Sequence, residues 1–425
     1  MNTTRTFKKF KRFSPYKLSD FLSNSTRKNK TTRKRRGTRR YGKKLEKNLG
    51  NKLGNKEFIF FGCWNKGLCN YNTSSPENGM SKVFKKLHEL KESPGFYIIA
   101  GDNYYPPKKE LEDYSYKYLN KEELESGFNC LKELNKPIHV LVGNHDVEQI
   151  REFEKIPKVN CIITDLQVQF MNKHNSFNYK HIYKKVGKTL IVFLNTTYLT
   201  EDWIKFTKCN KLLSQYKSSS SGNGGGNGGG NGGGDKDNNI YYKTLLDDEF
   251  MKYSKELSKF KDKIDNIILT GHDPLWGPKY KKKKQKDKFT PLLESGIHFI
   301  YDLYNIFPNA NKYYLCADTH LWHGGSDIII ERSNMDSHYY NTNMYRSPQR
   351  SKPNKLHIKQ YIVGTGGADL DDCPKKYSNT HTYNKSSKNS TKIIFKSDES
   401  KCHSTYGYLK VSLDKKTPSF NFIKV

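Results

Sequence analysis

The chain has 425 residues, of which 34% are hydrophobic, and its formal net charge at pH 7 is +32. No stretch approaches the roughly 18 uninterrupted apolar residues of a membrane-spanning helix, and the basic, polar N-terminus lacks the apolar segment of a secretory signal. Eight cysteines are scattered with no CxxC pair, which argues against a zinc ribbon and against a dense disulfide scaffold. We therefore expect free thiols in an intracellular protein, cytoplasmic or nuclear, with no membrane partner.

Residues 1–56 are the most basic part of the chain. They hold 20 lysines or arginines and only 2 acidic residues, so they carry +18 of the net charge. They lack sustained apolar periodicity, which predicts a disordered basic arm. Such an arm would bind nucleic acid or another polyanion through its charge. A nuclear address is an alternative, and so is an organellar presequence, because the first 19 residues contain no acidic residue.

Apolar runs alternate with helical patterns after the arm. Runs at 58–61, 97–100 and 138–142 predict buried strands. Residues 121–134 have a helical pattern, and so does the segment after Asn78, whose apolar residues are Met80, Phe84, Leu87 and Leu90. The alternation of strand, helix and strand is typical of an α/β fold.

The later part of the chain continues this pattern around a low-complexity segment. Residues 218–239 are serines followed by repeated Gly-Gly-Gly-Asn units, which predict a flexible insertion. A helix is predicted over 243–260, and strands are predicted over 189–194, 267–270, 313–316, 361–364, 408–413 and 420–425. The polar stretches 333–355 and 371–401 are expected to be surface loops. This many strands favours two sheets, and we expect one domain over 57–425 that the insertion interrupts.

Five polar motifs follow five of these apolar runs. They are Gly62-Cys63-Trp64, Gly101-Asp102-Asn103-Tyr104-Tyr105, Gly143-Asn144-His145-Asp146, Gly271-His272-Asp273-Pro274 and Ala317-Asp318-Thr319-His320. Open α/β sheets bind ligands in the crevice at the carboxyl ends of their strands, so side chains that follow successive strands converge there. Each motif alone is a weak signal, but the five in this order predict a functional site.

This order of motifs resembles the calcineurin-like metallophosphoesterase superfamily, whose pattern is GD, GDNxY, GNHD, GHxP and GHxH. The resemblance is nearest to the tartrate-resistant, purple acid phosphatase branch, because the second motif ends in Tyr105 and Leu275-Trp276 follows the fourth. Residues 364–367 resemble the family's glycine-rich C-terminal turn. The resemblance covers roughly residues 57–370. It implies a four-layer α/β/β/α sandwich of two mixed sheets flanked by helices, and metal-dependent hydrolysis of a phosphate ester, most simply a phosphomonoester.

The resemblance also implies a role for each motif residue. Asp102 would bridge two metal ions with its two carboxylate oxygens. Tyr105 and His320 would bind the first metal, while Asn144 and His272 would bind the second. His145 would protonate the leaving oxygen or hold the phosphate, and Asp146 would orient it. The metals would be divalent or trivalent ions of iron, zinc or manganese.

Two ligand positions depart from the family pattern. Cys63 replaces an aspartate that binds the first metal, and Asp318 replaces a histidine that binds the second. A thiolate binds iron or zinc and a carboxylate is a competent ligand, so a rearranged site is chemically possible. The second site is more nearly complete and is expected to be the better occupied. Asn65 and His323 are further candidates for weak or substitute ligands.

The alternative is a catalytically degenerate phosphoesterase fold that binds nucleic acid or another polyanion. In that interpretation Cys63 is only a small buried residue. Residues 279–288, with seven lysines and one acidic residue, would contribute positive charge to such binding. The same segment would attract anionic esters if it borders the crevice, or it is an exposed loop. The sequence leaves the physiological substrate and the oligomeric state open.

Overall fold

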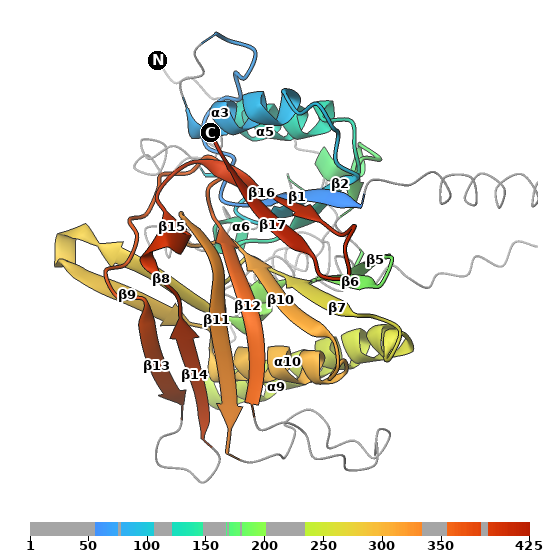
Figure 1. The fold of residues 1–425 in the computed structure, drawn as a ribbon, viewed down its shortest axis with the longest axis vertical. Helices are drawn as coiled ribbons and strands as arrows, with labels where there is room; N and C mark the ends of the chain where they lie inside the picture. The colour runs from blue at the N-terminus through green and yellow to red at the C-terminus, as the bar shows by residue number, and fades with distance from the viewer. Residues whose placement is uncertain are drawn as a thin grey trace, which may run out of the picture.

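Figure 1 shows the computed structural model of the chain, which describes residues 56–74, 78–105, 121–147, 167, 170–178, 181–200, 234–333, 355–383 and 390–425. The predicted basic arm lies outside these residues except for Lys56, and so does the segment 218–233 of the predicted insertion. The last six residues assigned to the insertion, 234–239, belong instead to a helix, α9 (Gly234–Leu257). The short helix η4 (Ser258–Phe260) follows it, as the sequence predicts.

The first sheet has six strands in the order β17-β16-β1-β2-β3-β4. Four neighbouring strands are parallel: β1 (Glu57–Phe61), β2 (Phe96–Ala100), β3 (Ile138–Leu141) and β4 (Phe177–Asn178). Two late strands extend the sheet beyond β1: β16 (Gly407–Ser412) pairs antiparallel with β1, and β17 (Ser419–Lys424) pairs antiparallel with β16. All five residues of β2 are buried, as expected for a strand covered on both faces.

The second sheet has nine strands and contains the rest of the predicted site. Its order is β13-β14-β11-β12-β10-β7-β6-β5, with β15 paired to β11, and β6, β7, β10 and β12 are parallel. The strands are β5 (Tyr183–Val186), β6 (Thr189–Phe193), β7 (Asn266–Thr270), β10 (Asn311–Cys316), β11 (Trp322–Arg332), β12 (Lys355–Val363), β13 (Ser378–Tyr383), β14 (Thr391–Lys396) and β15 (Cys402–His403). A separate hairpin is formed by β8 (Trp276–Lys281) and β9 (Lys286–Pro291).

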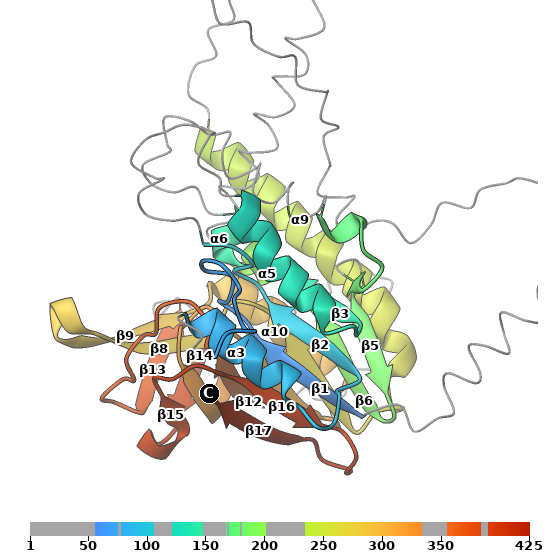
Figure 2. The same cartoon turned by 90° about the horizontal axis from the view of Figure 1, so that it is seen from above.

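Helices cover the outer face of each sheet. The helices α3 (Gly79–His88) and α5 (Lys121–Glu133) lie on the first sheet, and α9 and α10 (Glu294–Asn305) lie on the opposite side of the molecule against the second sheet (Figures 1 and 2). Between the sheets, the aromatic rings of Phe420 and Tyr361 stack with centroids 4.2 Å apart. The predicted four-layer sandwich of two mixed sheets is therefore confirmed.

The prediction that residues 371–401 form a surface loop is wrong in part. The polar stretch 371–401 is not only surface loop, because it contains the strands β13 and β14 and the short helix η7 (Glu399–Lys401). Within the other polar stretch, residues 334–354 lie outside the described residues. Among the described helices, none is long and apolar enough to cross a membrane.

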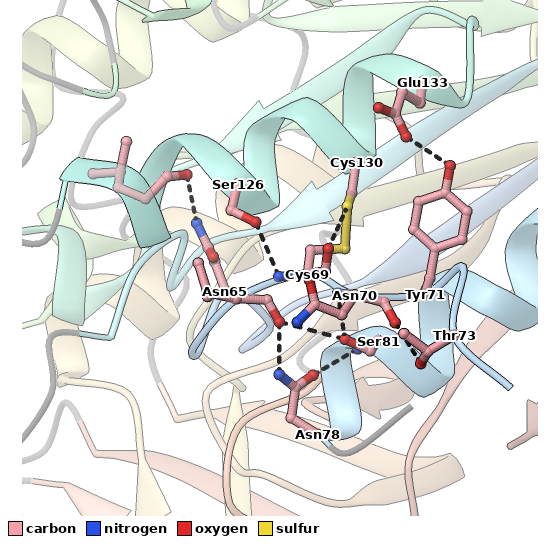
Figure 3. Close-up of a disulfide and its surroundings, with 12 residues drawn as sticks. Asn65, Cys69, Asn70, Tyr71, Thr73, Asn78, Ser81, Ser126, Cys130 and Glu133 are labelled. Atoms are coloured by element: carbon pink, nitrogen blue, oxygen red, sulfur yellow. Dashed lines mark hydrogen bonds between the residues drawn. A yellow bond between two sulfur atoms is a disulfide. The ribbon is translucent and has the colours of Figure 1, made fainter. Parts of the chain in front are cut away.

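Among the cysteines that the structure describes, four are paired, contrary to the expected free thiols. Cys69 is bonded to Cys130 and Cys373 to Cys402, whereas Cys63 and Cys316 are free and buried. The Cys69–Cys130 bond fastens the segment that follows β1 to α5 (Figure 3).

Candidate metal centre

All five motif segments meet at one edge of the molecule. They begin directly after, or two residues beyond, the carboxyl ends of β1, β2 and β3 in the first sheet and of β7 and β10 in the second. Backbone hydrogen bonds join motif segments from Cys63 N to Gly101 O at 3.2 Å and from Ala317 N to His272 O at 2.9 Å, and Gly62 N donates to Val363 O at the end of β12 at 3.0 Å. The sheets thus bring residues more than 200 positions apart into one site.

Asp102 lies at the middle of this site, and its two carboxylate oxygens face different side chains. Oδ2 accepts hydrogen bonds from the Tyr105 hydroxyl at 2.5 Å and the Cys63 thiol at 3.6 Å. Oδ1 lies 3.2 Å from His272 Nε2 and accepts a hydrogen bond from the backbone N–H of His145 at 2.9 Å. Burial raises the pKa of Asp102, but the nearby histidines and Tyr105 lower it to about 2. Asp102 is therefore a carboxylate whose Oδ2 faces Tyr105 and Cys63 and whose Oδ1 faces His272.

The backbone is strained at three of the predicted ligands. Cys63, Asp102 and Asp318 have φ values of 53°, 52° and 42°, which place them in the left-handed region that residues with a side chain rarely adopt. Such strain persists where the surrounding structure enforces it, and it is concentrated at functional sites. At residue 143 a glycine is required, because a Cβ there would lie 2.4 Å from Asp102 Oδ1.

The Oδ2 half of the centre contains Cys63, Tyr105 and His320. The Tyr105 hydroxyl lies 3.1 Å from His320 Nε2, and the other ring nitrogen, Nδ1, lies 2.6 Å from the backbone oxygen of Asp369. A histidine whose Nδ1–H is bound to a carbonyl presents Nε2 as a ligand. Burial, with Asp102 adding to it, raises the pKa of both the Cys63 thiol and the Tyr105 phenol well above the usual range.

The Oδ1 half of the centre contains His272, Asn144 and Asp318. His272 Nδ1 lies 2.6 Å from the backbone oxygen of Ala100, so its Nε2 faces the centre. This one nitrogen is surrounded by three oxygens: Asn144 Oδ1 at 2.8 Å, Asp102 Oδ1 at 3.2 Å and Asp318 Oδ1 at 3.8 Å. Burial lowers the pKa of His272, but Asp102, Asp273 and Asp318 raise it to about 9. These oxygens and the nitrogen all carry lone pairs, so a cation between them, either a proton or a metal ion, stabilises the arrangement.

The two predicted catalytic residues have different surroundings. His145 is half-buried, and its ring centroid lies 4.7 Å from that of Tyr105. Asp146 is buried and accepts hydrogen bonds from the backbone N–H groups of Gly143 and Asn103 at 2.8 and 2.9 Å, and from Gln167 Nε2 at 2.8 Å. Asp146 thus joins the second and third motif segments, and its predicted role in orienting His145 stays a prediction.

Neither substitute ligand considered from the sequence is held at the centre. Asn65 is fully buried and donates a hydrogen bond from Nδ2 to the backbone oxygen of Leu124 on α5. His323 points into the second sheet's core, where its Nδ1 lies 2.6 Å from Ser326 Oγ and its ring packs on Phe395. Burial lowers the pKa of His323 to about 4.

Two supporting residues were missed by sequence reasoning. Asp371 accepts a hydrogen bond at Oδ2 from the backbone N–H of His320 at 3.1 Å, and its Oδ2 also lies 2.9 Å from Lys279 Nζ. The acidic cluster 369–372 after the glycine-rich turn was a signal for Asp371. Thr196 holds the fourth motif, because its Oγ1 accepts the backbone N–H groups of His272 and Asp273 at 3.0 and 2.9 Å. No pattern in the sequence pointed to Thr196.

The donors of this centre are suited to binding metal. Oδ1 of Asp102 lies beside the imidazole nitrogen of His272, and Oδ2 lies beside the Tyr105 oxygen and the Cys63 sulfur. Nitrogen, oxygen and sulfur are the ligand types that iron, zinc and manganese accept. Cys63, Asp102 and His272 each bring a ligand atom within 4.8 Å of the others. A metal ion there would replace the proton on His272 and the protons on the thiol and phenol.

A protein-family model described as calcineurin-like phosphoesterase matches residues 58–322, which is more than half of the chain. The matched range begins in β1 and ends at the start of β11, so it includes all five motif segments. No match was found among curated proteins.

Proposed function

The chain belongs to the calcineurin-like phosphoesterase family, and we propose that it is an acid-phosphatase-like phosphomonoesterase with a dinuclear metal site. The family supports metal-dependent hydrolysis of phosphate esters in general. The observation that carries the finer proposal is the division of Asp102, whose Oδ2 faces Cys63 and Tyr105 while its Oδ1 faces His272. A carboxylate that binds a single metal ion would need further ligands beside only one of its oxygens.

Bound metal ions would lower the pKa of a water molecule and neutralise the phosphate oxygens during in-line attack. The chain's own residues bind and orient these partners. Nδ1 contacts with backbone oxygens fix the rings of His272 and His320 so that Nε2 points inward. His145, half-buried beside Tyr105, is placed to donate a proton to the leaving oxygen or to hold the phosphate. No covalent intermediate on the protein is required.

Cys63 decides between an active and a degenerate enzyme. Its strained backbone and its thiol contact with Asp102 support the role of a ligand, because a residue that only fills space needs neither. Sulfur is a soft ligand, so we propose zinc or ferrous iron rather than ferric iron on this side. The branch assignment to purple acid phosphatases rests on Tyr105, whose hydroxyl lies between Asp102 and His320.

The test is metal content together with hydrolysis of a phosphomonoester and a phosphodiester by the natural protein, Cys63→Asp and Asp102→Ala. We expect the natural protein to bind about two metal ions, to prefer the monoester, and to lose activity in Asp102→Ala. Activity that arises only in Cys63→Asp would identify a degenerate member of the family. Polyanion binding through residues 1–56 would then be the leading function, and it stays a separate proposal in either case.

A further inference from the structure

The β8–β9 hairpin carries an unusual concentration of positive charge. Residues 279–288 include seven lysines and one acidic residue, with the short helix η5 (Lys282–Lys284) at the turn. Among the described strands, β8 and β9 pair only with each other, apart from one bridge between Tyr280 and Asp372. Figures 1 and 2 show the hairpin extending away from both sheets.

The lysines of the two strands share one face of the hairpin. Lys279 lies opposite Lys288, and Lys281 lies opposite Lys286. Because side chains alternate along a strand and directly opposite residues point the same way, these four form a single lysine face. Like charges placed opposite each other across antiparallel strands destabilise the pair, so this face retains a repulsion that a bound anion would relieve.

The other face of the hairpin is docked, which fixes its orientation. Asp287 accepts hydrogen bonds from the backbone N–H groups of Lys375 and Lys376 at 2.8 and 3.0 Å. Tyr280 donates its backbone N–H to Asp372 at 3.0 Å, and Lys375 Nζ lies 4.6 Å above the Tyr280 ring. The Cys373–Cys402 disulfide holds this docking segment in turn.

The lysine face begins at the metal centre. Lys279 Nζ lies 2.9 Å from Asp371 Oδ2, the same atom that accepts the backbone N–H of His320. Burial lowers the pKa of Lys279, but Asp371, Asp318 and Cys63 raise it, so its ammonium lies within the field of the centre's own residues. Lys281 is two residues further along the strand, about 7 Å from Lys279 at the usual rise of a strand.

The outer lysines of this face have no partner of opposite charge in the part of the chain that the structure describes. Among the described residues, no ion pair is formed by Lys281, Lys286 or Lys288, whereas Lys282 is paired with Asp372. The pKa of Lys288 is lowered by burial and then by Lys281 and Lys279. Lysines on an exposed edge strand also prevent aggregation. That role alone does not explain why the lysine face begins beside the metal centre.

We propose that the lysine face binds a second phosphate group of the substrate while the scissile phosphate lies at the metal centre. This proposal rests on the proposed function. It names the substrate class as compounds that carry two or more phosphate groups in a row. A phosphate beyond the scissile one would be bound by Lys281 and Lys288, because Lys279 is already paired with Asp371.

The test compares Lys281→Ser/Lys288→Ser with the control Lys415→Ser/Lys416→Ser. The control removes the same charge from exposed positions in the β16–β17 turn, at the other end of the first sheet. We expect the first variant to lose about tenfold in kcat/KM for adenosine triphosphate, mainly through KM, because charge-assisted contacts are lost. Hydrolysis of p-nitrophenyl phosphate should change less than about twofold, and the control should change neither.

Two further measurements keep the outcomes distinct. Lys281→Arg/Lys288→Arg should retain the preference for adenosine triphosphate, which shows that charge and not folding was lost. Equal losses on both substrates, or no loss on either, would overturn the proposal. If no ester is hydrolysed, the proposed function fails, but affinity for tripolyphosphate still tests the face. It should fall about tenfold in Lys281→Ser/Lys288→Ser relative to the control, and an unchanged affinity would refute the lysine face.

Discussion

Two buried histidines, one at the metal centre and one between the sheets, have opposite pKa shifts. His272 is fully buried, and three nearby carboxylates outweigh burial and raise its pKa to about 9. His139 on β3 is 3% exposed, and burial, with Lys184 and His181 adding to it, lowers its pKa to about 3. Its ring stacks on Phe193 with centroids 4.3 Å apart. Burial is the same in both regions, so the surplus of negative charge is what marks the metal centre.

The largest expected effect comes from Asp102→Ala, which removes the central negative charge of the metal centre. Asp102→Ala removes the oxygens that both halves of the centre share, so we expect both metal ions to be lost. Activity should fall more than about 100-fold, because residues that only support a ligand already cost 10–100-fold. Metal analysis and steady-state kinetics measure both quantities. Retention of two metal ions by Asp102→Ala would show that Asp102 does not bridge them.

The Cys69–Cys130 disulfide should contribute to stability, because it fastens the segment that follows β1 to α5. Cys69→Ser/Cys130→Ser opens a link across 61 residues and is expected to lower the free energy of unfolding by about 2–4 kcal/mol. Denaturant unfolding measures this change. Cys130 is buried and the backbone N–H of Cys69 donates a hydrogen bond to Ser126 Oγ at 3.0 Å, so the remaining contacts should preserve the fold (Figure 3). Peptide mapping that finds both cysteines as free thiols would contradict the pairing.

The interior histidine predicts acid sensitivity that does not come from the metal centre. A folded-state pKa of about 3 lies below the unfolded value, so the unfolded state binds the proton first and stability is lost as the pH falls below about 6.5. At pH 5 the loss from His139 is about 2 kcal/mol. His139→Phe keeps an aromatic ring between Phe96 and Phe193 and should abolish this loss.

Unfolding experiments at pH 7.5 and pH 5 measure that difference. His357 on β12 is exposed, so His357→Gln should leave the pH dependence of the natural protein unchanged. Equal acid sensitivity in the natural protein and in His139→Phe would mean that His139 is solvated in the folded state. The contrast between the two histidines would then be wrong for His139.

The sequence predicted the parts of this molecule that repeat a local pattern. Buried parallel strands are continuous apolar runs, so β1, β2, β3, β7 and β10 and the polar residues after them could be located. The strand β13, Ser378–Tyr383, has no buried residue and no apolar run, so it resembled a loop. The Cys69–Cys130 pair and the Lys279–Asp371 contact join residues 61 and 92 positions apart, which no spacing rule specifies. The assignments of Asp102, Asn144 and His145 to ligand or catalytic roles stay predictions until metal is measured.

The smallest expected effect comes from Asp318→Asn, which tests how much Asp318 contributes to the negative charge of the metal centre. The Asp318 side chain is 35% exposed and lies 3.8 Å from His272 Nε2, so solvent weakens its influence relative to that of buried Asp102. Asp318→Asn should therefore lower metal affinity about tenfold, near the lower end of the range for supporting residues. In the metal-free protein it should also shift the pKa of His272 downward from about 9, because one of the three carboxylates that raise it is removed. Isothermal titration with zinc and an NMR titration measure these changes, and Asp327→Asn on β11, whose side chain is 46% exposed, is the control. A loss as large as that of Asp102→Ala would make Asp318 an equal partner in holding the metals.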